Sequence, residues 1–169
     1  IKHIAGNRFS LGEPDGSESD RLKFISEILK KSGFRAPIQK NIRDEIWLKL
    51  IGNLSFNPIS ALTGATLEQI CNDQGTEQIV KEMMIEAKTI AEKLGAKINM
   101  SIEKRIDGAR KVGAHKTSML QDIEAGKPIE IDSIIVAVKE LGGLTRSPTP
   151  YIDTILSLTL QKAKLIGCL

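Results

Sequence analysis

The spacing of apolar and polar positions changes near residue 40 and divides the chain into two parts. Residues 1–39 alternate short extended runs with one helical run. From residue 41 onward, nearly every apolar run repeats at the spacing of a helix. We therefore expect a mainly α fold, with an all-helical domain over residues 40–169 that follows a short α/β part over residues 1–39.

The first part is predicted as strand, strand, helix and strand. Ser17 or Ser19 caps the helix. The four elements are expected at residues 1–4, 8–13, 20–31 and 34–38. So few residues cannot bury a core alone, so this part needs a sheet to join. Because the chain also begins at Ile1 without a methionine, we expect it to be a fragment of a longer protein. Its strands would then have lost their neighbours in the sheet and should tend to associate with other chains.

The second part is predicted as a series of amphipathic helices that are broken at glycine and proline. Pro58 predicts a kink or an end in the first of them, and Gly142-Gly143 predicts the end of a later one. The basic residues of the helix over 101–112 are interpreted as a solvated face. The predicted helices are 45–60, 67–71, 77–94, 101–112, 133–141 and 151–165, with a short helix that stops at Gly126.

The first of these helices carries polar groups inside an apolar pattern. Lys49, Asn53 and Asn57 stand at i, i+4 and i+8 and therefore share one face. Burying an ammonium and two carboxamides is costly unless each finds a partner, so this face should meet other polar side chains or a wet cleft. In the alternative, Lys49 reaches solvent while the asparagines bond to neighbouring loop backbone. The spacing leaves both interpretations open.

A turn between two later helices, residues 127–131, places a carboxylate among apolar neighbours. The turn is expected to be extended because a residue before proline avoids the helical region. Thr117 or Ser118 caps the helix before it, and Asp132 is expected to cap the helix after it. Glu130 could point inward, where it would need a donor, or be an ordinary exposed glutamate, and the local pattern leaves both open.

Composition and charge argue against several classes of protein. The 169 residues are 41% hydrophobic and 27% charged, which is ordinary for a soluble globular protein. A net charge of +3 and only one Trp, one Tyr and four Phe give little basis for binding nucleic acid. No apolar run approaches the roughly 20 residues of a membrane span, and no signal segment opens the chain. We expect a cytoplasmic protein that binds neither nucleic acid nor membrane.

The chemistry that the sequence lacks narrows the choice further. Cys71 and Cys168 are far apart and nothing resembles a Cys/His cluster, so we expect no metal site and no disulfide. His3 and His115 are isolated, which gives little support to a nucleophile of the Ser/His/Asp or Cys/His kind. No Walker loop or GxGxxG motif is present to cradle a pyrophosphate. The remaining lysine, asparagines, serine and glutamate suit the recognition and protonation of a carbonyl compound.

Three stretches taken together resemble the ketopantoate reductase (2-dehydropantoate 2-reductase) family. They are residues 45–63, with the pattern EIWLKLxxNxxxNPxxALT, residues 117–122, TSMLQD, and residues 130–132, EID. Residues 6–13 also look like the end of that family's Rossmann domain. The resemblance covers essentially the whole chain and implies an N-terminal NADPH-binding domain, of which residues 1–39 match the last part. It also implies a helical domain that closes over the substrate.

The resemblance further implies roles for individual residues. Lys49 would be the general acid that protonates the forming alkoxide while hydride arrives from NADPH, and partial burial would make it a better donor near neutral pH. Asn53 and Asn57 would orient the 2-oxo acid substrate, and Ser118 would contact its carboxylate. Glu130 would hold the substrate hydroxyl, order the site around Lys49 or contact the cofactor. The main cofactor site would lie upstream of this chain, so the fragment alone is expected to be inactive.

Two other functions remain open. Some members of the family carry an asparagine just before the TSMLQD motif. This chain has His115-Lys116 there, so the substrate could be another 2-oxo acid. Alternatively, residues 41–169 could form a homodimer through their opening and closing helices and carry no chemistry. The absent GxGxxG favours such a module, whereas the lysine and asparagine stripe disfavours it.

Overall fold

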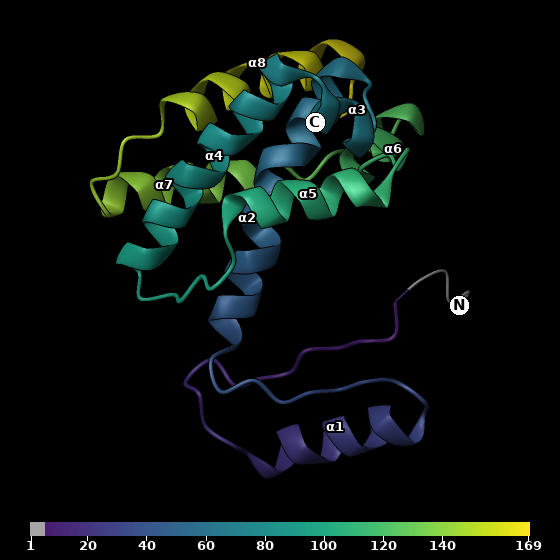
Figure 1. The fold of residues 1–169 in the computed structure, drawn as a ribbon, viewed down its shortest axis with the longest axis vertical. Coiled ribbons are helices and arrows are strands. Elements are labelled where there is room, and N and C mark those ends of the chain that lie inside the picture. The colour runs from purple at the N-terminus through teal and green to yellow at the C-terminus, as the bar shows by residue number, and fades with distance from the viewer. Residues whose placement is uncertain (1–5) are drawn as a thin grey trace. The chain divides into compact units, whose positions relative to one another are not determined.

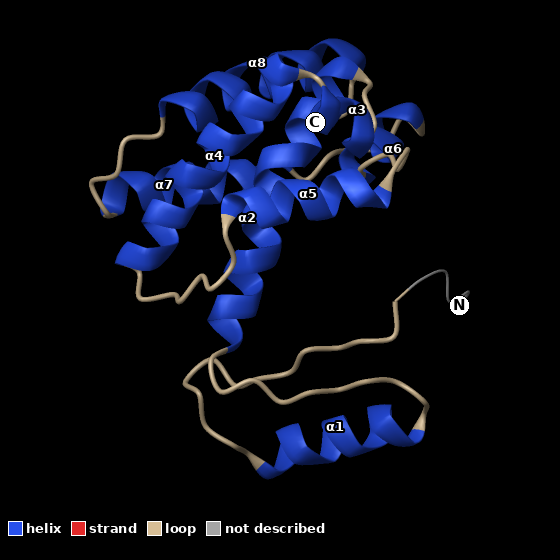
Figure 2. Ribbon diagram, in the orientation of Figure 1, coloured by secondary structure: helices blue, strands red, loops and turns tan. Residues whose placement is uncertain are grey.

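A computed structural model describes residues 6–169 of the chain, so the strand predicted at residues 1–4 lies outside the described part. The described residues are mainly helical, and Figure 2 draws none of them as a strand. Contacts divide the chain into two units, Ile1–Trp47 and Leu48–Leu169, and the division falls within the long helix α2 (Ile42–Thr63). The predicted mainly α fold is confirmed, while the domain boundary predicted after residue 39 stays a prediction.

In the first unit, two extended segments pair in parallel on either side of helix α1 (Asp20–Lys31). The backbone N–H of Phe9 donates to the carbonyl of Arg35 over 2.8 Å. Parallel segments joined by a helical crossover are the expected arrangement at the edge of an α/β domain. The segments predicted at 8–13 and 34–38 are therefore paired, although through isolated bridges rather than through continuous strands.

Helix α1 begins and ends at the predicted residues. Of the two predicted caps, Ser19 is the one used, and its hydroxyl accepts a hydrogen bond from the backbone N–H of Leu22 over 3.2 Å. Leu22 is buried, but other apolar side chains of the helix are at least 44% exposed. These are Phe24, Ile25 and Ile28. A contiguous exposed apolar surface of this kind is typical of a face that packs against another element.

Glu13 is a buried carboxylate in the segment that precedes α1. The guanidinium of Arg21 donates to its two oxygens over 2.6 and 2.8 Å, and the hydroxyl of Ser19 donates to one of them. The hydrogen bonds from Arg21 and then Ser19 lower the pKa of Glu13 from 4.5 to about 2. Because the pKa is lower in the folded state, ionised Glu13 stabilises the unit above pH 4.5. That stabilisation is lost as the pH falls from 4.5 to about 2.

We expect the substitution Glu13→Gln to flatten the acid dependence of stability in the first unit. Urea unfolding between pH 5 and pH 2, followed by the NMR signals of α1, measures it. The wild-type midpoint should fall across this range, and the midpoint of the variant should fall less, because glutamine cannot titrate. The exposed Glu18 supplies a matched control, Glu18→Gln, which should behave like the wild type. Parallel curves for Glu13→Gln and the wild type would refute the role of Glu13.

In the second unit, α2 is the central helix. From residue 51 to residue 61 every residue of α2 is buried except Asn53, which is half-buried. Helix α4 packs against α5, α7 and α8 (Figure 1). The surrounding elements are α3 (Leu67–Asn72), α4 (Gln74–Lys93), α5 (Ile102–Val112), α6 (Ser118–Glu124), the π-helical turn η1 (Asp132–Val136), α7 (Ala137–Leu144) and α8 (Pro150–Ile166). The predicted helical frame around the first helix is therefore confirmed.

The helix ends predicted at Gly142-Gly143 and, as one of two alternatives, at Pro58 are wrong because packing overrides the local signal. The kink that was the other alternative at Pro58 stays a prediction. Helix α2 continues through Pro58, which is fully buried, and ends at Thr63. Helix α7 likewise continues through Gly142 to Leu144. A Cβ atom at position 142 would lie 2.9 Å from Cγ2 of Thr149, so this glycine permits close packing rather than ending the helix.

Candidate functional site

The predicted polar stripe is present on α2 and runs from the surface into the interior. Lys49 is exposed, Asn53 is half-buried, and Asn57 is only 5% exposed. Because α2 is continuous over this range, the three side chains share one face, as their spacing predicted. The helix thus brings together three of the five predicted site residues.

Asn57 carries a buried hydrogen-bond donor that has no partner. Its Nδ2 is inaccessible to solvent and makes no hydrogen bond within residues 6–169. Leaving such a donor unsatisfied costs about 1–3 kcal/mol, and folded proteins rarely tolerate it without a reason. The interpretation in which this group bonds to neighbouring loop backbone therefore does not describe Asn57. An unsatisfied buried donor of this kind makes the buried end of the stripe a candidate contact for a polar ligand or a bound water.

Lys49 lies at the opposite, exposed end of the stripe. Its ammonium makes no hydrogen bond or ion pair with the described part of the chain. The partial burial that we expected of Lys49 is not provided by this chain, because the side chain extends into solvent. An unpaired ammonium at the surface is free to approach a carbonyl or a negative charge on a ligand.

Ser118 and Glu130 come from two other elements. Ser118 is the first residue of α6 and is exposed, while Thr117 is the cap and accepts from the N–H of Leu120 over 3.3 Å. Glu130 is exposed, which is the second of the two alternatives left open by the sequence. Within the described residues, no hydrogen bond joins any of the five predicted site residues to another. Their proximity to the stripe remains a prediction.

The last turns of α8 and the residues that follow it contact both the segment before η1 and the buried end of α2. The backbone N–H of Ile129 donates to the carbonyl of Cys168 over 3.0 Å. Nζ of Lys162 donates to the carbonyl of Ala61, in the final turns of α2, over 2.5 Å. Lys162 and Cys168, near the C-terminus, thus hydrogen-bond both to the turn of α2 that follows Asn57 and to the segment that leads to Glu130.

Asp132 does not cap a helix as predicted but starts the π-helical turn η1. Ile131 before it already has helical backbone angles, φ −76° and ψ −47°, so no cap is formed and no side chain accepts a capping hydrogen bond. The N–H of Ala137 donates to the carbonyl of Asp132, five residues earlier. Single π-helical turns are frequent at functional sites, and this one begins two residues after Glu130.

The basic residues of α5 are not all a solvated face, so this prediction is wrong for two of them. Arg110 is half-buried and donates to Glu77 over 3.1 Å and to the carbonyl of Cys71 over 2.9 Å. Arg105 is also half-buried and its Nε has no partner in the described residues. The signal that could have revealed Arg105 is Gly52, because a glycine inside a buried helix usually marks a close approach of another group.

Three further observations concern the described residues as a whole. No group of three or more His, Cys, Asp or Glu side chains in residues 6–169 is arranged to hold a metal ion. None of the described helices combines the length and hydrophobicity needed to cross a lipid bilayer. Cys71 and Cys168 are both buried and both free thiols.

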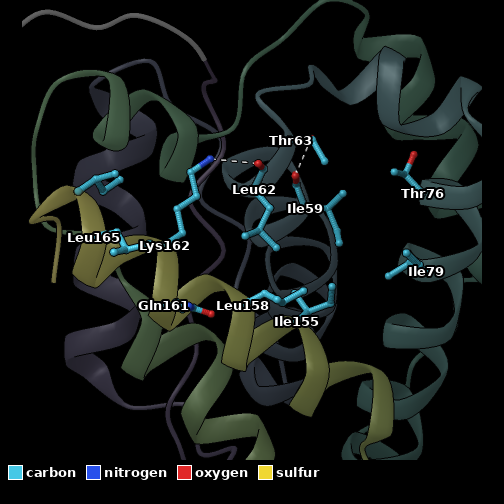
Figure 3. A pocket seen from close by; sticks show the side chains of 11 residues that line it. Ile59, Leu62, Thr63, Thr76, Ile79, Ile155, Leu158, Gln161, Lys162 and Leu165 are labelled. Atoms are coloured by element: carbon cyan, nitrogen blue, oxygen red, sulfur yellow. Dashed lines mark hydrogen bonds between the residues drawn. The ribbon is translucent and has the colours of Figure 1, made fainter.

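An apolar groove lies between the end of α2, α4 and α8 (Figure 3). It has a volume of about 460 Å³, and Nζ of Lys162 at its edge donates to the carbonyl of Leu62 over 3.0 Å. Leu158 and Leu165 in its wall are 48% and 80% exposed. The groove is lined by Ile59, Leu62, Thr63, Thr76, Ile79, Ile155, Leu158, Gln161, Lys162, Leu165 and Ile166. None of the five predicted site residues is among them.

Comparison with known proteins gives a consistent result. The family model described as "Ketopantoate reductase PanE/ApbA C terminal" matches residues 41–163. A 2-dehydropantoate 2-reductase of Mesorhizobium japonicum is 52% identical over 168 residues, which are 99% of this chain and 52% of that protein. Two solved structures are also similar over nearly the whole of this chain.

The first is a Ralstonia solanacearum protein assigned as a ketopantoate reductase. It has a TM-score of 0.93 and 40% identity, and the match covers 99% of this chain and 51% of that one. The second is the 2-dehydropantoate 2-reductase of Methylococcus capsulatus, with a TM-score of 0.90 and 30% identity, covering 98% of this chain and 57% of that one. The chain thus spans about half the length of the relatives that it matches.

Proposed function

Because the chain belongs to the ketopantoate reductase family, as the match over residues 41–163 shows, we propose that it forms the C-terminal half of an NADPH-dependent 2-dehydropantoate 2-reductase. The resemblance seen in the sequence is confirmed by this match. The proposed reaction reduces the keto group of ketopantoate to the hydroxyl of pantoate. The observation that carries the proposal is the stripe on α2, in which a free cation and a buried unpartnered carboxamide share one face.

In this proposal Lys49 supplies the proton of the reduction. The reaction adds a hydride to the keto carbon and a proton to the keto oxygen. NADPH, when bound, supplies the hydride. Nζ of Lys49 donates a hydrogen bond to the keto oxygen, stabilises the negative charge that develops there and transfers the proton. Its exposed, unpaired ammonium is what supports this role.

Asn53 and Asn57 orient the substrate relative to Lys49. At 1.5 Å per residue, Asn53 lies about 6 Å along the helix axis from each of the other two. A small acid held at Asn53 is therefore within reach of the long lysine side chain on one side and of Nδ2 of Asn57 on the other. Substrate binding would satisfy the buried Nδ2 donor, which the chain alone leaves without a partner.

Ser118 and Glu130 complete the proposed site on the basis of the family likeness. The hydroxyl of Ser118 contacts the substrate carboxylate. Glu130 holds the substrate hydroxyl, orders Lys49 or contacts the cofactor. The exposure of both side chains supports these roles, since each is free to meet a ligand.

The first part of the chain, residues 1–39, is proposed to be the last portion of an NADPH-binding domain, with residues 40–169 as the substrate-binding domain. Support comes from the parallel pairing around α1 and from the apolar face of α1, which would pack against the rest of such a sheet. The pyrophosphate of NADPH would be held by residues outside this chain, so these 169 residues alone should be inactive. A cytoplasmic location is part of the proposal, supported by the two free thiols.

The function is tested by measuring NADPH oxidation by the intact protein with ketopantoate and with other 2-oxo acids. Turnover that is most efficient with ketopantoate would support the proposal. Turnover with a different 2-oxo acid would overturn the substrate while keeping the reductase. Absence of both NADPH binding and turnover would overturn the enzymatic proposal.

A second candidate function is self-association through the apolar groove. The groove lies between α2 and α8, the two helices predicted to form a homodimer contact. A neighbouring apolar pocket shares Ile79 and Ile155 with it and extends the apolar surface to Tyr151, which is 40% exposed. Continuous exposed apolar surface favours a protein partner, and we propose a second copy of the chain.

We expect the chain to sediment as a dimer and the substitution Leu158→Glu to shift it toward the monomer. A charge placed at the centre of an apolar interface should raise the dissociation constant by about 30-fold or more. Sedimentation velocity over a range of concentrations measures this. Leu144→Glu is the matched control, because Leu144 is 80% exposed and lies outside the groove. A wild type that stays monomeric at high concentration would contradict the proposal.

A further inference from the structure

Arg105 of α5 is a half-buried cation that the proposed mechanism does not use. Its Nε is inaccessible to solvent and lacks a hydrogen-bond partner in residues 6–169, and no ion pair compensates its charge there. Burial lowers the pKa of Arg105 from its ordinary value. Arg110, five residues further on, has its charge balanced within the chain, because Glu77 and Asp107 both pair with it. A desolvated charge without a partner destabilises a protein unless something else supplies the counter-charge.

None of the described residues that line the pocket around Arg105 is a carboxylate. The side chain lies in a small pocket whose walls are apolar except for Ser101 and Lys88. Lys88 adds a second positive charge and is itself paired with Glu92, over 3.6 Å. The titratable group that lines the pocket from α4 is therefore a cation balanced by Glu92, so the uncompensated charge is that of Arg105 itself, which an anion from outside the chain could neutralise.

Arg105 is packed against α2 at Gly52. A Cβ atom at position 52 would lie 2.2 Å from Nη2 and 2.8 Å from Nε of Arg105, so a side chain there would displace the guanidinium from this place on the helix surface. Gly52 follows Lys49 by three residues, and positions three apart are neighbours on a helix. At about 100° per residue, Gly52 lies roughly 60° to one side of Lys49, while Asn53 lies about 40° to the other. Arg105 therefore packs against α2 on the side of Lys49 that is away from Asn53.

From this arrangement we propose that Arg105 binds the carboxylate of the 2-oxo acid substrate, beside Lys49 at the keto oxygen. The inference rests on the proposed function. In a 2-oxo acid the carboxylate and the keto group are on adjacent carbons, which matches two neighbouring cations on one helix face. The planar guanidinium can donate two parallel hydrogen bonds to a carboxylate and neutralise its charge. The single hydroxyl of Ser118 can add a hydrogen bond but no charge.

Steady-state kinetics of the intact protein with Arg105→Gln test the proposal. The KM for ketopantoate should rise about 10- to 100-fold, because a charge-assisted pair is lost, while the KM for NADPH changes less than about twofold. Arg105→Lys should recover part of the loss, since it keeps the charge without the fork. Lys104→Gln is the matched control on the same helix and should behave like the wild type.

A neutral substrate separates carboxylate binding from a structural role. The amide of ketopantoate lacks the negative charge, so the wild type should strongly prefer the acid and Arg105→Gln should lose most of that preference. Equal losses on acid and amide would overturn the proposal and show a structural role. A rise in the KM for NADPH alone would also overturn it and identify a cofactor phosphate as the anion. Unchanged kinetics would overturn it as well.

Anion binding can also be measured without turnover, which distinguishes this proposal from the proposed function. In the ¹⁵N-labelled intact protein, titration with pyruvate should shift the Nε–H resonance of Arg105, and inorganic phosphate should shift it less. If ketopantoate is not reduced but this shift occurs, the function fails and the carboxylate site stands. If pyruvate causes no shift, the carboxylate site is refuted.

Discussion

Replacing Lys49 with alanine should lower the turnover number of the intact reductase by about 10²- to 10⁴-fold. This is the range expected when a positioned general acid is removed, because water must then protonate the alkoxide and its developing charge loses a nearby cation. Steady-state oxidation of NADPH with ketopantoate measures the effect. The KM for NADPH should change little, since Lys49 acts on the substrate oxygen.

The matched control for this experiment is Lys104→Ala. Lys104 is also an exposed lysine of the second unit, but it lies on α5 and makes no ion pair with the described residues. Its removal should leave turnover within about twofold of the wild type. Turnover of Lys49→Ala within a fewfold of the wild type would show that Lys49 is not the acid.

Replacing Leu54 with alanine should destabilise the second unit by about 2–5 kcal/mol. Leu54 is fully buried on α2, between Asn53 and Ser55, and its deletion leaves a cavity inside the helix frame. Since whole domains are stable by only about 5–15 kcal/mol, this single change should remove a large part of the stability. Urea unfolding followed by circular dichroism measures the free energy difference.

Leu144→Ala is the control for the packing prediction. Leu144 is the same residue type but is 80% exposed at the end of α7, so its truncation should change the free energy of unfolding by less than about 0.5 kcal/mol. Similar losses for the two variants would contradict the central place of α2 in the core. A destabilisation below about 1 kcal/mol for Leu54→Ala would do the same.

The sequence pattern predicted the helix ends, caps and helix faces that depend on residues close together in the chain. Helix α1 begins and ends where the cap at Ser19 and the break after Lys31 predicted. The stripe on α2 followed from spacing alone, because a continuous helix must place i, i+4 and i+8 on one face. The cap at Thr117 was also among those predicted.

Packing between distant segments decided the features that the sequence did not predict. Pro58 lies inside α2 because the buried surroundings of that helix outweigh the loss of one backbone hydrogen bond. Gly142 lies inside α7 because Thr149 comes too close for a side chain. These tertiary contacts are not evident from the local pattern. The prediction therefore followed the usual rule that proline and glycine end a helix, which does not hold at these two positions.

In the candidate site, too, the local pattern predicted which residues share a helix face, but tertiary contacts determine their burial and pairing. The sequence placed Lys49 and Asn57 on one face but could not tell that one is exposed while the other is buried with a free donor. It also assigned Arg105 to a solvated face, because the partner surface at Gly52 is 53 positions earlier in the chain. Depth and pairing depend on tertiary contacts, and these are what turn a polar stripe into a candidate binding site.

The most direct test of the central claim is a crystal structure of the intact protein with NADP⁺ and pantoate. We predict that pantoate lies against the stripe on α2, with its 2-hydroxyl within hydrogen-bond distance of Nζ of Lys49 and with Nδ2 of Asn57 satisfied. We also predict that its carboxylate meets the guanidinium of Arg105. Pantoate bound away from Lys49, Asn53 and Asn57 would contradict the account.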